Sequence, residues 1–558
     1  MLFRNRQFSD APIALGIKGL SVATAGGTEP VAILNAIDVT IRQGETVCLV
    51  GESGSGKSVT SLAIMGLLPK GALEVTGGRI ELDAQNLIEL DPGQMRELRA
   101  QRISMIFQEP MTALNPVMRV GDQIEEVLDS HTKLPAREKK RRVIDIMEQV
   151  HLPDVERIYN SYPHQLSGGQ RQRIMIAMAL ILEPKLLIAD EPTTALDVTT
   201  QNQVLKLIAE LQEKHGTAVL FITHDMGVVA EIADTVYVMR HGAIVESAAV
   251  ETLLRDPQKD YTRRLLQAVP SLIPRDARAE SQAEPALWVE GLTKIYDTRG
   301  FFKRGRETKA AQDVRFCIKP GRTLGIVGES GSGKSTVARC IMRLIDPTRG
   351  HIKVCQADIA NLSRTELRPH RKHIQIVFQD PFRSLNPRWT VGESLIEGPL
   401  NFGQSRTEAL KHTAELMELV GLPRDAPSRY PHQFSGGQRQ RIAIARAIAM
   451  RPDILVADEA VSALDVSVQA QVLKLLDELQ EKLGIAILFI THDLRVAAQI
   501  CDEVAVMQHG KIVEHDTAAN VLSRPRHDYT RALIEAAPGR YWDFANFREL
   551  APHQFQTA

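Results

Sequence analysis

The chain has 558 residues, with 67 lysine and arginine residues against 68 aspartate and glutamate residues and a formal net charge of −1 at pH 7. This balance gives no electrostatic attraction to nucleic acid or anionic lipid, so any membrane role would need a protein partner. The N-terminus lacks the apolar core of a signal peptide, and the longest apolar run, residues 174–182, is far shorter than the roughly 20 residues that span a bilayer. We therefore expect a chain that stays in the compartment where it is made.

One set of motifs occurs twice. The residues Gly-Glu-Ser-Gly-Ser-Gly-Lys-Ser stand at 51–58 and again at 328–335. Each copy is followed, in the same order, by a glutamine, a Ser-Gly-Gly-Gln signature, an Asp-Glu pair and a histidine. A repeat of roughly 270 residues predicts two copies of one large domain joined head to tail, although length alone would favour three or four domains.

Short β-branched segments alternate with longer helical patterns. In the first copy, residues 45–50, 185–189 and 218–223 have the composition of buried strands. The alternation predicts an α/β fold with a mostly parallel sheet between helices. The polar helical stretches 134–149 and 406–419 predict a helical subdomain inserted in each sheet. Reactive groups at the strand ends should gather along one edge of the sheet.

A glycine-rich turn follows the first of these strands and opens a helix. Such a turn presents backbone N–H groups and a helix N-terminus to an anion, and glycine lets the backbone approach closely. Lys57 and Lys334 should then reach the β- and γ-phosphate oxygens, and Ser58 and Ser335 should bind Mg²⁺. The candidate nucleotide-binding residues of the turns are Gly51, Ser53, Gly54, Ser55, Gly56, Lys57, Ser58 and Val59 in the first copy, and Gly328, Ser330, Gly331, Ser332, Gly333, Lys334, Ser335 and Thr336 in the second.

An Asp-Glu pair ends an apolar strand in each copy. The aspartates, Asp190 and Asp458, are placed to bind Mg²⁺ directly or through water. The next side chain of a strand points the other way, so Glu191 and Glu459 are predicted to orient and deprotonate an attacking water. An Asp-Glu pair after a strand is usually only a solvated turn, but the neighbouring motifs favour catalysis here.

A histidine follows another buried-type strand in each copy. His224 and His492 share the context Phe-Ile-Thr-His-Asp. A lone histidine at a strand end is more often structural. The identical context in both copies favours a hydrogen bond to the γ-phosphate and to the catalytic glutamate.

The most distinctive motif is Ser-Gly-Gly-Gln followed by Arg-Gln-Arg and an apolar helix. With the other motifs it makes nearly the whole chain resemble the ATP-binding-cassette (ABC) ATPases. The resemblance implies two P-loop domains, each with a RecA-like mostly parallel core, an antiparallel N-terminal β subdomain and an inserted helical subdomain, and it implies ATP and Mg²⁺ as cofactors. The implied catalytic residues are Glu191, Glu459, His224, His492, Gln108 and Gln379, and the implied metal ligands are Ser58, Gln108, Asp190, Ser335, Gln379 and Asp458.

In that family the signature contacts the γ-phosphate held by the opposite cassette, so that two cassettes close over two ATP molecules. Hydrolysis of the ATP then lets the two cassettes separate. The N-terminus of a helix supplies positive potential at the γ-phosphate, where negative charge accumulates. The resemblance implies that Ser167, Gly168, Gly169 and Gln170 complete the site of Lys334, and that Ser435, Gly436, Gly437 and Gln438 complete the site of Lys57.

Four segments indicate one group within this family, the importers. Residues 108–116 and 379–387 look like the glutamine loops of peptide, nickel and opine importers, and residues 260–266 and 528–534 look like their cassette tails. The fusion of two cassettes is similar to the Yej-type and glutathione-type peptide importer ATPases. The implied activity is ATP hydrolysis that drives uptake of a peptide-like solute.

The resemblance also implies partners and a location. The partners are two transmembrane permease subunits and a periplasmic solute-binding protein, with no nucleic acid, and the location is the cytoplasmic face of the inner membrane. Coupling helices of the permeases would contact residues 109–118 and 380–389. The expected domains are residues 1–270 with a helical subdomain at about 115–166, a linker at 271–286, residues 287–540 with a helical subdomain at about 386–434, and a tail at 541–558.

Two features depart from the family pattern. An aromatic residue that stacks on adenine usually precedes the glycine-rich turn; Tyr296 fits this role in the second copy, whereas Thr24 stands there in the first. Several importers of this group carry a cysteine cluster for an iron-sulfur centre near the C-terminus of the cassette, whereas no cysteine follows Cys501 here. The five cysteines, Cys48, Cys317, Cys340, Cys355 and Cys501, show no metal-ligand spacing, so we expect buried, reduced thiols.

Three other functions are considered for a tandem-cassette chain without membrane spans. A DNA-repair protein would need zinc-binding sets of cysteines, and the sequence has none. A ribosome-associated translation factor would typically carry a long charged helical linker, and the short linker and the neutral charge argue against it. A nucleotide switch that does not hydrolyse ATP is disfavoured by the intact Glu191 and Glu459.

Overall fold

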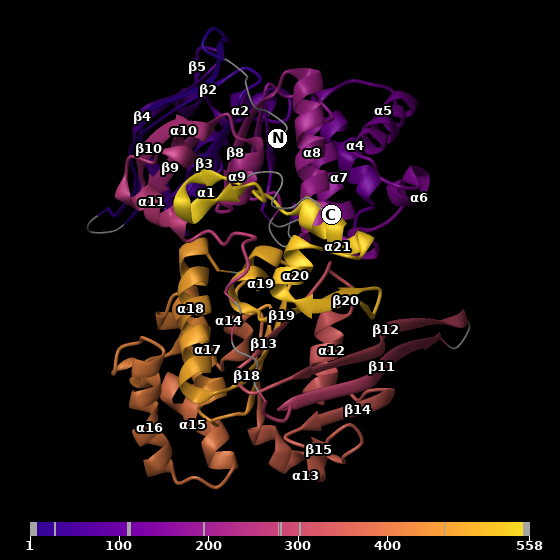
Figure 1. Ribbon diagram of the computed structural model, residues 1–558. Coiled ribbons are helices and arrows are strands. Elements are labelled where there is room, and N and C mark those ends of the chain that lie inside the picture. Colours follow the sequence, from indigo (N-terminus) through magenta and orange to yellow (C-terminus); the bar gives the residue numbers. More distant parts are fainter. Residues whose placement is uncertain are drawn as a thin grey trace. The chain divides into compact units, whose positions relative to one another are not determined.

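The computed structural model describes residues 8–550 except 27–29, 109–112, 194–195, 277, 279–281, 301–302 and 463, and it describes the backbone alone at the remaining positions of 298–306. The chain divides into two compact units (Figure 1): Met1–Val269 with Phe544–Arg548, and Pro270–Asp543 with Glu549–Ala558. Within the described residues, no helix is long and apolar enough to cross a bilayer.

The first unit has a six-stranded sheet of order β10-β9-β3-β8-β7-β6, in which only the β9–β10 pair is antiparallel. A second, antiparallel sheet has the order β2-β1-β4-β5. The strands are β1 (Ile13–Thr24), β2 (Ala32–Arg42), β3 (Thr46–Val50), β4 (Leu73–Leu82), β5 (Gln85–Asn86), β6 (Ile103–Ile106), β7 (Leu186–Asp190), β8 (Ala218–Thr223), β9 (Thr235–Arg240) and β10 (Ala243–Ala249).

The helices of the first unit cover the parallel sheet and form the inserted subdomain. They are α1 (Lys57–Ile64), α2 (Pro92–Leu98), α4 (Val120–His131), α5 (Ala136–Gln149), α6 (Val155–Tyr159), α7 (Gly168–Leu180), α8 (Val198–His215), α9 (Met226–Ile232), α10 (Val250–Arg255) and α11 (Asp260–Gln267), with 3₁₀ turns η1 (Leu87–Glu89) and η2 (Pro163–Gln165). In the inserted helix α5, Val143, Ile146 and Met147 are the buried residues, and their spacing gives one apolar face on an otherwise polar helix.

The second unit repeats this architecture. Its sheets have the orders β16-β17-β18-β13-β19-β20 and β12-β11-β14-β15, and a two-stranded sheet β21-β22 follows. The strands are β11 (Leu287–Gly300), β12 (Lys303–Ile318), β13 (Thr323–Val327), β14 (Arg349–Val354), β15 (Ala357–Asp358), β16 (Ile374–Val377), β17 (Ile454–Asp458), β18 (Ala486–Thr491), β19 (Glu503–Gln508), β20 (Lys511–Thr517), β21 (Trp542–Asp543) and β22 (Arg548–Glu549).

The helices of the second unit also match those of the first in order. They are α12 (Lys334–Ile341), α13 (Arg364–Leu367), α14 (Pro381–Ser384), α15 (Val391–Asn401), α16 (Arg406–Leu419), α17 (Gly436–Ile448), α18 (Val466–Leu483), α19 (Leu494–Ile500), α20 (Ala518–Ser523) and α21 (Asp528–Ala536), with 3₁₀ turns η3 (Arg368–Lys372), η4 (Ala426–Ser428) and η5 (Pro431–Gln433). The turn η6 (Phe544–Asn546) belongs to the first unit.

In each unit the antiparallel sheet shares a hydrophobic core with the parallel sheet. In the first unit Leu15 and Ile37 belong to the same buried cluster as Leu49, Ile188 and Leu220. The central strands β3, β7 and β8 are buried along their whole length, as expected for parallel strands covered on both faces. The predicted α/β class, with an antiparallel sheet and a helical insertion in each of two repeated units, is confirmed.

The expectation that all five cysteines are buried is wrong for two of them. Cys48, Cys340 and Cys501 are buried, whereas Cys317 and Cys355 are exposed, and all five are free thiols. Cys317 lies on β12 and Cys355 follows β14 in the turn to β15, so both are on the antiparallel sheet rather than in the parallel core.

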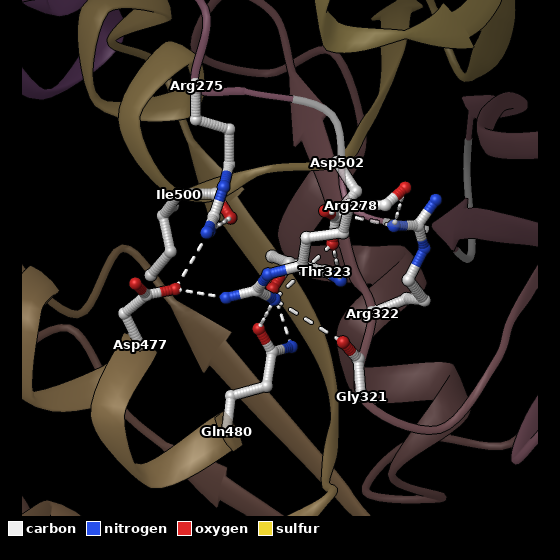
Figure 2. Close-up of polar contacts among 9 residues, drawn as sticks. All are labelled: Arg275, Arg278, Gly321, Arg322, Thr323, Asp477, Gln480, Ile500 and Asp502. Carbon is white, nitrogen blue, oxygen red and sulfur yellow. Dashed lines mark hydrogen bonds and ion pairs between the residues drawn. The ribbon is translucent and has the colours of Figure 1, made fainter. Parts of the chain in front are cut away.

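The segment that follows the first unit is held against the second unit by two arginines (Figure 2). Arg275 Nη1 donates to Asp477 Oδ1 at 2.8 Å, and its backbone N–H donates to Ala498 O at 2.9 Å. The Arg278 guanidinium donates to the same Asp477 carboxylate and to Gln480, both on α18. One carboxylate therefore fixes two arginines of the expected linker.

Removing that carboxylate should release the segment. The position equivalent to Asp477 in α8 is Ala209, so Asp477→Ala introduces a side chain that this helix already accommodates in the first unit. Losing partly exposed charge-assisted hydrogen bonds should cost about 1 to 2 kcal/mol and open the segment about 5- to 30-fold more often. Limited trypsin digestion should then cut after Arg275 and Arg278 faster by that factor. Glu481→Ala, on the same helix, is the control, and equal digestion rates for all three proteins would contradict the assignment.

Candidate nucleotide site

The glycine-rich loop of the first unit joins β3 to α1. Gly51 has a φ of 153°, and a Cβ there would lie 2.2 Å from the backbone oxygen of Met239 on β9. Only glycine fits at this point. Lys57 is 6% exposed, and its ammonium donates to the carbonyl oxygens of Gly51 at 2.8 Å and Glu52 at 2.9 Å. The lysine therefore lies across the loop.

The second unit repeats this geometry. Gly328 has a φ of 151°, and a Cβ there would lie 2.3 Å from the Met507 oxygen on β19. Lys334 Nζ donates to the carbonyl oxygens of Gly328 at 2.7 Å and Glu329 at 2.8 Å.

The donors around each loop fit a phosphate group. No side chain caps the start of α1 or α12, and an uncapped helix start beside a lysine is the arrangement that binds phosphate. A Cβ on Gly54 or Gly331 would meet nothing within 4 Å, so one side of each loop is open. The hydroxyls of Ser55 and Ser332 are buried and have no hydrogen-bond partner among the described residues.

The aspartate of each Asp-Glu pair faces the start of the helix after the loop. Ser58 Oγ donates to Asp190 Oδ1 at 3.3 Å, and Ser61 Oγ donates to Asp190 Oδ2 at 3.2 Å. Burial raises the pKa of Asp190, the Ser58 and Ser61 hydroxyls oppose this, and the charge of Glu191 adds to it. A buried carboxylate with a raised pKa gains most from a nearby cation, so this pair of oxygen ligands fits Mg²⁺.

The second unit keeps the aspartate with one fewer donor. Ser335 Oγ donates to Asp458 Oδ1 at 3.2 Å, and Ala338 stands where the first unit has Ser61. Burial raises the pKa of Asp458 as well, with Ser335 opposing and the charge of Glu459 adding to the shift.

The candidate catalytic glutamate of the first unit is held by a glutamine and a histidine. Gln108 Nε2 donates to Glu191 Oε2 at 2.9 Å, and His224 Nδ1 lies 3.2 Å from Glu191 Oε1. Asp190 and Glu191 thus contact different groups, but Glu191 lies just after β7 rather than in it, so strand alternation does not set the direction of its side chain. Glu191 has a left-handed φ of 46° just after β7, while its N–H still donates to Ile222 O on β8 at 2.9 Å.

In the second unit Gln379 Nε2 donates to Glu459 Oε2 at 2.9 Å, and His492 Nδ1 lies 3.5 Å from the same oxygen. Glu459 is also left-handed, with a φ of 49°. Burial alone would raise the pKa of Glu459, but the hydrogen bond and charge of His492, together with Lys334, hold the pKa below its ordinary value. The carboxylate is therefore ionised at neutral pH, as a proton acceptor must be.

The signature forms a separate network at the start of α7 and α17. Ser167 Oγ accepts from the Gln170 N–H at 3.2 Å, and Gln170 Oε1 accepts from the Ser167 N–H at 3.0 Å, which is a capping box. Ser435 and Gln438 repeat it at 3.3 and 3.0 Å. The signature residues thus form the N-terminal caps of α7 and α17.

The two glycines of each signature have different surroundings. A Cβ on Gly169 would lie 2.6 Å from Thr200 Cγ2, and one on Gly437 would lie 2.2 Å from Val468 Cγ1. A Cβ on Gly168 or Gly436 would meet nothing within 4 Å. The second glycine is therefore required for helix packing, and the first leaves open space at the helix start.

The proposed adenine-stacking positions also differ. Tyr296 is 40% exposed on β11, and Lys294 Nζ lies 5.2 Å from the centre of its ring. Thr24 accepts a hydrogen bond from the Val31 N–H at 2.9 Å through its hydroxyl, so this side chain is tied to its own hairpin. The second unit presents an aromatic face at this position and the first does not.

The family assignment comes from sequence comparison. The model of the ABC transporter family matches residues 34–194 and again residues 311–462. The chain belongs to the ABC transporter family. ABC cassettes bind and hydrolyse ATP, and this ABC protein is an ATPase. The oligopeptide/dipeptide transporter C-terminal region matches residues 245–293 and 513–546, so the resemblance to the importer family is confirmed.

Several curated proteins are similar to this ABC protein along most of its length. The "Glutathione import ATP-binding protein GsiA" of Salmonella choleraesuis (strain SC-B67) is 46% identical, over 95% of this chain and 90% of that protein. The protein of the same name in Escherichia coli (strain K12) is 45% identical over the same shares. A solved structure, "Dimeric Structure of MJ0796, a Bacterial ABC Transporter Cassette", is 29% identical over 42% of this chain and 98% of that one, with a TM-score of 0.38.

Two tyrosines that the sequence reasoning missed contact the glycine-rich loops of this ABC protein. The Glu52 N–H donates to the Tyr261 hydroxyl at 3.3 Å, and the Glu329 N–H donates to the Tyr529 hydroxyl at 3.1 Å. Both tyrosines lie on the helices α11 and α21, in the C-terminal family regions. The repeated Asp-Tyr-Thr-Arg sequence at residues 260–263 and 528–531 was the available signal. These tyrosines position the loops.

Proposed function

We propose that this chain is the ATP-hydrolysing subunit of an importer that takes up a peptide-like solute, with glutathione as the first solute to test. The observation that carries the proposal is the 45–46% identity over 95% of the chain to glutathione import ATP-binding proteins. The same similarity disfavours the translation-factor alternative. The proposal requires two permease subunits in the inner membrane, a periplasmic solute-binding protein, and a peripheral position for this chain on the cytoplasmic side.

The groups around each loop would hold the substrate ATP. Lys57, the loop amides and the start of α1 bind its phosphates, while Ser58, Asp190 and Gln108 hold Mg²⁺ in the first site. Bound Mg²⁺ would neutralise phosphate charge during transfer of the γ-phosphoryl group to water. The second site uses Lys334, Ser335, Asp458 and Gln379 in the same roles.

The glutamates would carry the proton transfer. Glu191, oriented by Gln108 and His224, accepts a proton from the water that attacks the γ-phosphate. Glu459 acts in the same way beside Gln379 and His492. Since each glutamate has donors on its carboxylate oxygens, its orientation is fixed before substrate arrives.

The signatures would complete the sites across the chain. Ser167 to Gln170 cover the ATP at Lys334, and Ser435 to Gln438 cover the ATP at Lys57. The open space at Gly168 and Gly436 supports this part of the proposal, because an anion can approach the helix start there. ATP binding then closes the two units, and hydrolysis reopens them.

The segments after the glutamines are the proposed contacts for the permeases. In residues 380–389, the side chains of Phe382 and Trp389 are 62% and 39% exposed, and the Arg439 guanidinium lies 3.8 Å from the centre of the Phe382 ring. In residues 109–118, positions 109–112 lie outside the described residues, and Val117 is 80% exposed. Exposed apolar side chains of this kind suit an incoming helix.

We expect the two sites to differ in affinity for ATP. Loss of aromatic stacking on adenine costs about 1 to 3 kcal/mol, or roughly 5- to 150-fold in binding. The first site should therefore bind ATP more weakly. A fluorescent ATP analogue is titrated into two variants: Lys334→Ala, which keeps only the first site intact, and Lys57→Ala, which keeps only the second. Thr24→Tyr in the Lys334→Ala background should strengthen binding. Equal affinities in the two lysine variants would contradict the prediction.

Uptake measurements test the proposed cargo. Cells that lack this chain should lose uptake of labelled glutathione or labelled dipeptides. The wild-type chain should restore uptake, whereas the Glu191→Gln, Glu459→Gln double variant should not. Affinity purification of the tagged chain from solubilised membranes should recover permease subunits. Normal uptake of both solutes without the chain, with the chain co-sedimenting with ribosomes, would refute the importer proposal.

A further inference from the structure

A cysteine, a histidine and an aspartate meet at a corner of the second unit, outside the nucleotide site. Cys355 lies in the turn between β14 and β15, His373 immediately precedes β16, and Asp453 immediately precedes β17. One potential ligand atom from each side chain lies within 4.8 Å of the others. His373 Nδ1 is 2.7 Å from Asp453 Oδ2, and the backbone N–H of Asp453 donates to His373 O at 3.0 Å.

The same corner of the first unit carries a different set of residues. By strand register, Asp83, Arg102 and Lys185 occupy the positions of Cys355, His373 and Asp453. Lys185 Nζ donates to both oxygens of Asp83 at 2.9 Å. In the first unit an ion pair thus joins the β4–β5 turn to the start of β7. Two of the three side chains at this corner, Arg102 and Lys185, are cations that repel a metal ion.

Turn chemistry does not account for the cysteine. Cys355 and Gln356 have left-handed φ values of 46° and 71°, and the first-unit turn has 49° and 65° at Asp83 and Ala84. Aspartate, asparagine and glycine suit such a hairpin turn, so Asp83 is the expected residue type and Cys355 is not. The Cys355 thiol lies near the Asp453 carboxylate, with its sulfur within 4.8 Å of a carboxylate oxygen.

The three side chains match the ligands of a borderline metal ion. Zn²⁺ binds thiolate sulfur at about 2.3 Å, and imidazole nitrogen and carboxylate oxygen at about 2.0 to 2.2 Å, usually with four ligands. Ligand atoms at such distances from a common centre lie about 3 to 4 Å apart. The three atoms, all within 4.8 Å of one another, therefore need only small shifts, in which His373 Nδ1 and Asp453 Oδ2 move slightly apart from their present 2.7 Å. Mg²⁺ and Ca²⁺ prefer oxygen ligands, so the thiol and imidazole select against them.

We propose that Cys355, His373 and Asp453 bind a borderline divalent cation of the Zn²⁺ type, with water at the remaining position. On binding, the Cys355 thiol releases its proton to solvent and its sulfur bonds the metal. The proton that His373 Nδ1 shares with Asp453 also leaves to solvent, the neutral ring carries its proton on Nε2, and Nδ1 bonds the metal. The metal would link the β14–β15 turn of the antiparallel sheet to the residues that precede β16 and β17 of the parallel sheet. It therefore does for the second unit what the Asp83 to Lys185 ion pair does for the first.

The internal repeat supplies the variant that removes the site. Cys355→Asp with Asp453→Lys transplants the ion pair of the first unit into the second, so the corner keeps a cross-link known to be compatible with this turn. Nucleotide-free, full-length protein with reduced thiols is titrated with Co²⁺, and the thiolate-to-cobalt absorption band is followed. The wild type should show this band at one equivalent, and Zn²⁺ should abolish it in competition. The double variant should lose the band and bind Zn²⁺ at least about 100-fold more weakly at this site.

Two further variants guard against binding elsewhere. Cys317→Ser removes the other exposed thiol and should leave the band unchanged. Asp83→Cys with Arg102→His and Lys185→Asp builds the trio in the first unit and should add a second equivalent. Intrinsic tryptophan fluorescence reports folding of the second unit alone, because Trp288, Trp389 and Trp542 all lie there. Absence of the cobalt band in the folded wild type, or its retention in the folded Cys355→Asp, Asp453→Lys variant, would overturn the proposal.

Discussion

The double variant Glu191→Gln, Glu459→Gln is expected to lose ATP turnover by about 10²- to 10⁴-fold while it still binds ATP, because an amide cannot accept the proton of the attacking water. The substitution preserves the size of the side chain, and its amide oxygen can still accept from Gln108 or Gln379. Loss of activity should therefore not reflect loss of structure. Release of phosphate at saturating ATP measures turnover, and binding of a fluorescent ATP analogue measures affinity.

Single variants make this test sharper. Glu191→Gln leaves the second site intact and Glu459→Gln leaves the first, so together they show whether one site can turn over alone. Glu481→Gln, an exposed glutamate on α18, is the control for the substitution itself. Undiminished turnover in the double variant would mean that neither glutamate is the proton acceptor, and the catalytic assignment would have to be abandoned.

The parts of the site that sequence alone predicted are those encoded within a few residues. The loop from Gly51 to Ser58 combines glycine, lysine and serine at fixed offsets, and the strand that ends at Asp190 is a continuous apolar run. Such patterns report local backbone geometry directly. The left-handed φ of Glu191 was not predictable in this way, because glutamate is not among the residues that favour this conformation.

Contacts between residues distant in sequence could not be predicted. The Tyr261 hydroxyl accepts from Glu52, 209 residues earlier, and His373 pairs with Asp453, 80 residues later. The cysteine spacing gave no sign of the proposed metal site, since His373 and Asp453 come near Cys355 only where the β14–β15 turn of one sheet meets the starts of β16 and β17 of the other. Sheet topology, which a single sequence does not specify, brings these side chains together.

The two glycines of the second signature should fail in different ways when each is replaced by alanine. A Cβ on Gly437 would lie 2.2 Å from Val468 Cγ1, so Gly437→Ala forces α17 away from α18 and should destabilise the second unit by about 1 to 3 kcal/mol. Gly436→Ala meets open space and adds a better helix former, so stability should be unchanged or increased by up to about 1 kcal/mol. Urea unfolding followed by tryptophan fluorescence measures both effects, because the tryptophans lie in the second unit.

ATP turnover should reverse this order of severity. If Gly436 lies against the γ-phosphate bound at Lys57, its added methyl group displaces an anion from the helix start, and turnover should fall by about 10²-fold in a fully folded protein. Gly437→Ala combined with Val468→Ala should recover much of the lost stability, because the collision is with that valine. Gly169→Ala, next to Thr200 in the first unit, should leave the tryptophan signal unchanged. A Gly436→Ala protein with normal turnover would show that the helix start does not contact the substrate, and it would remove the main support for shared nucleotide sites.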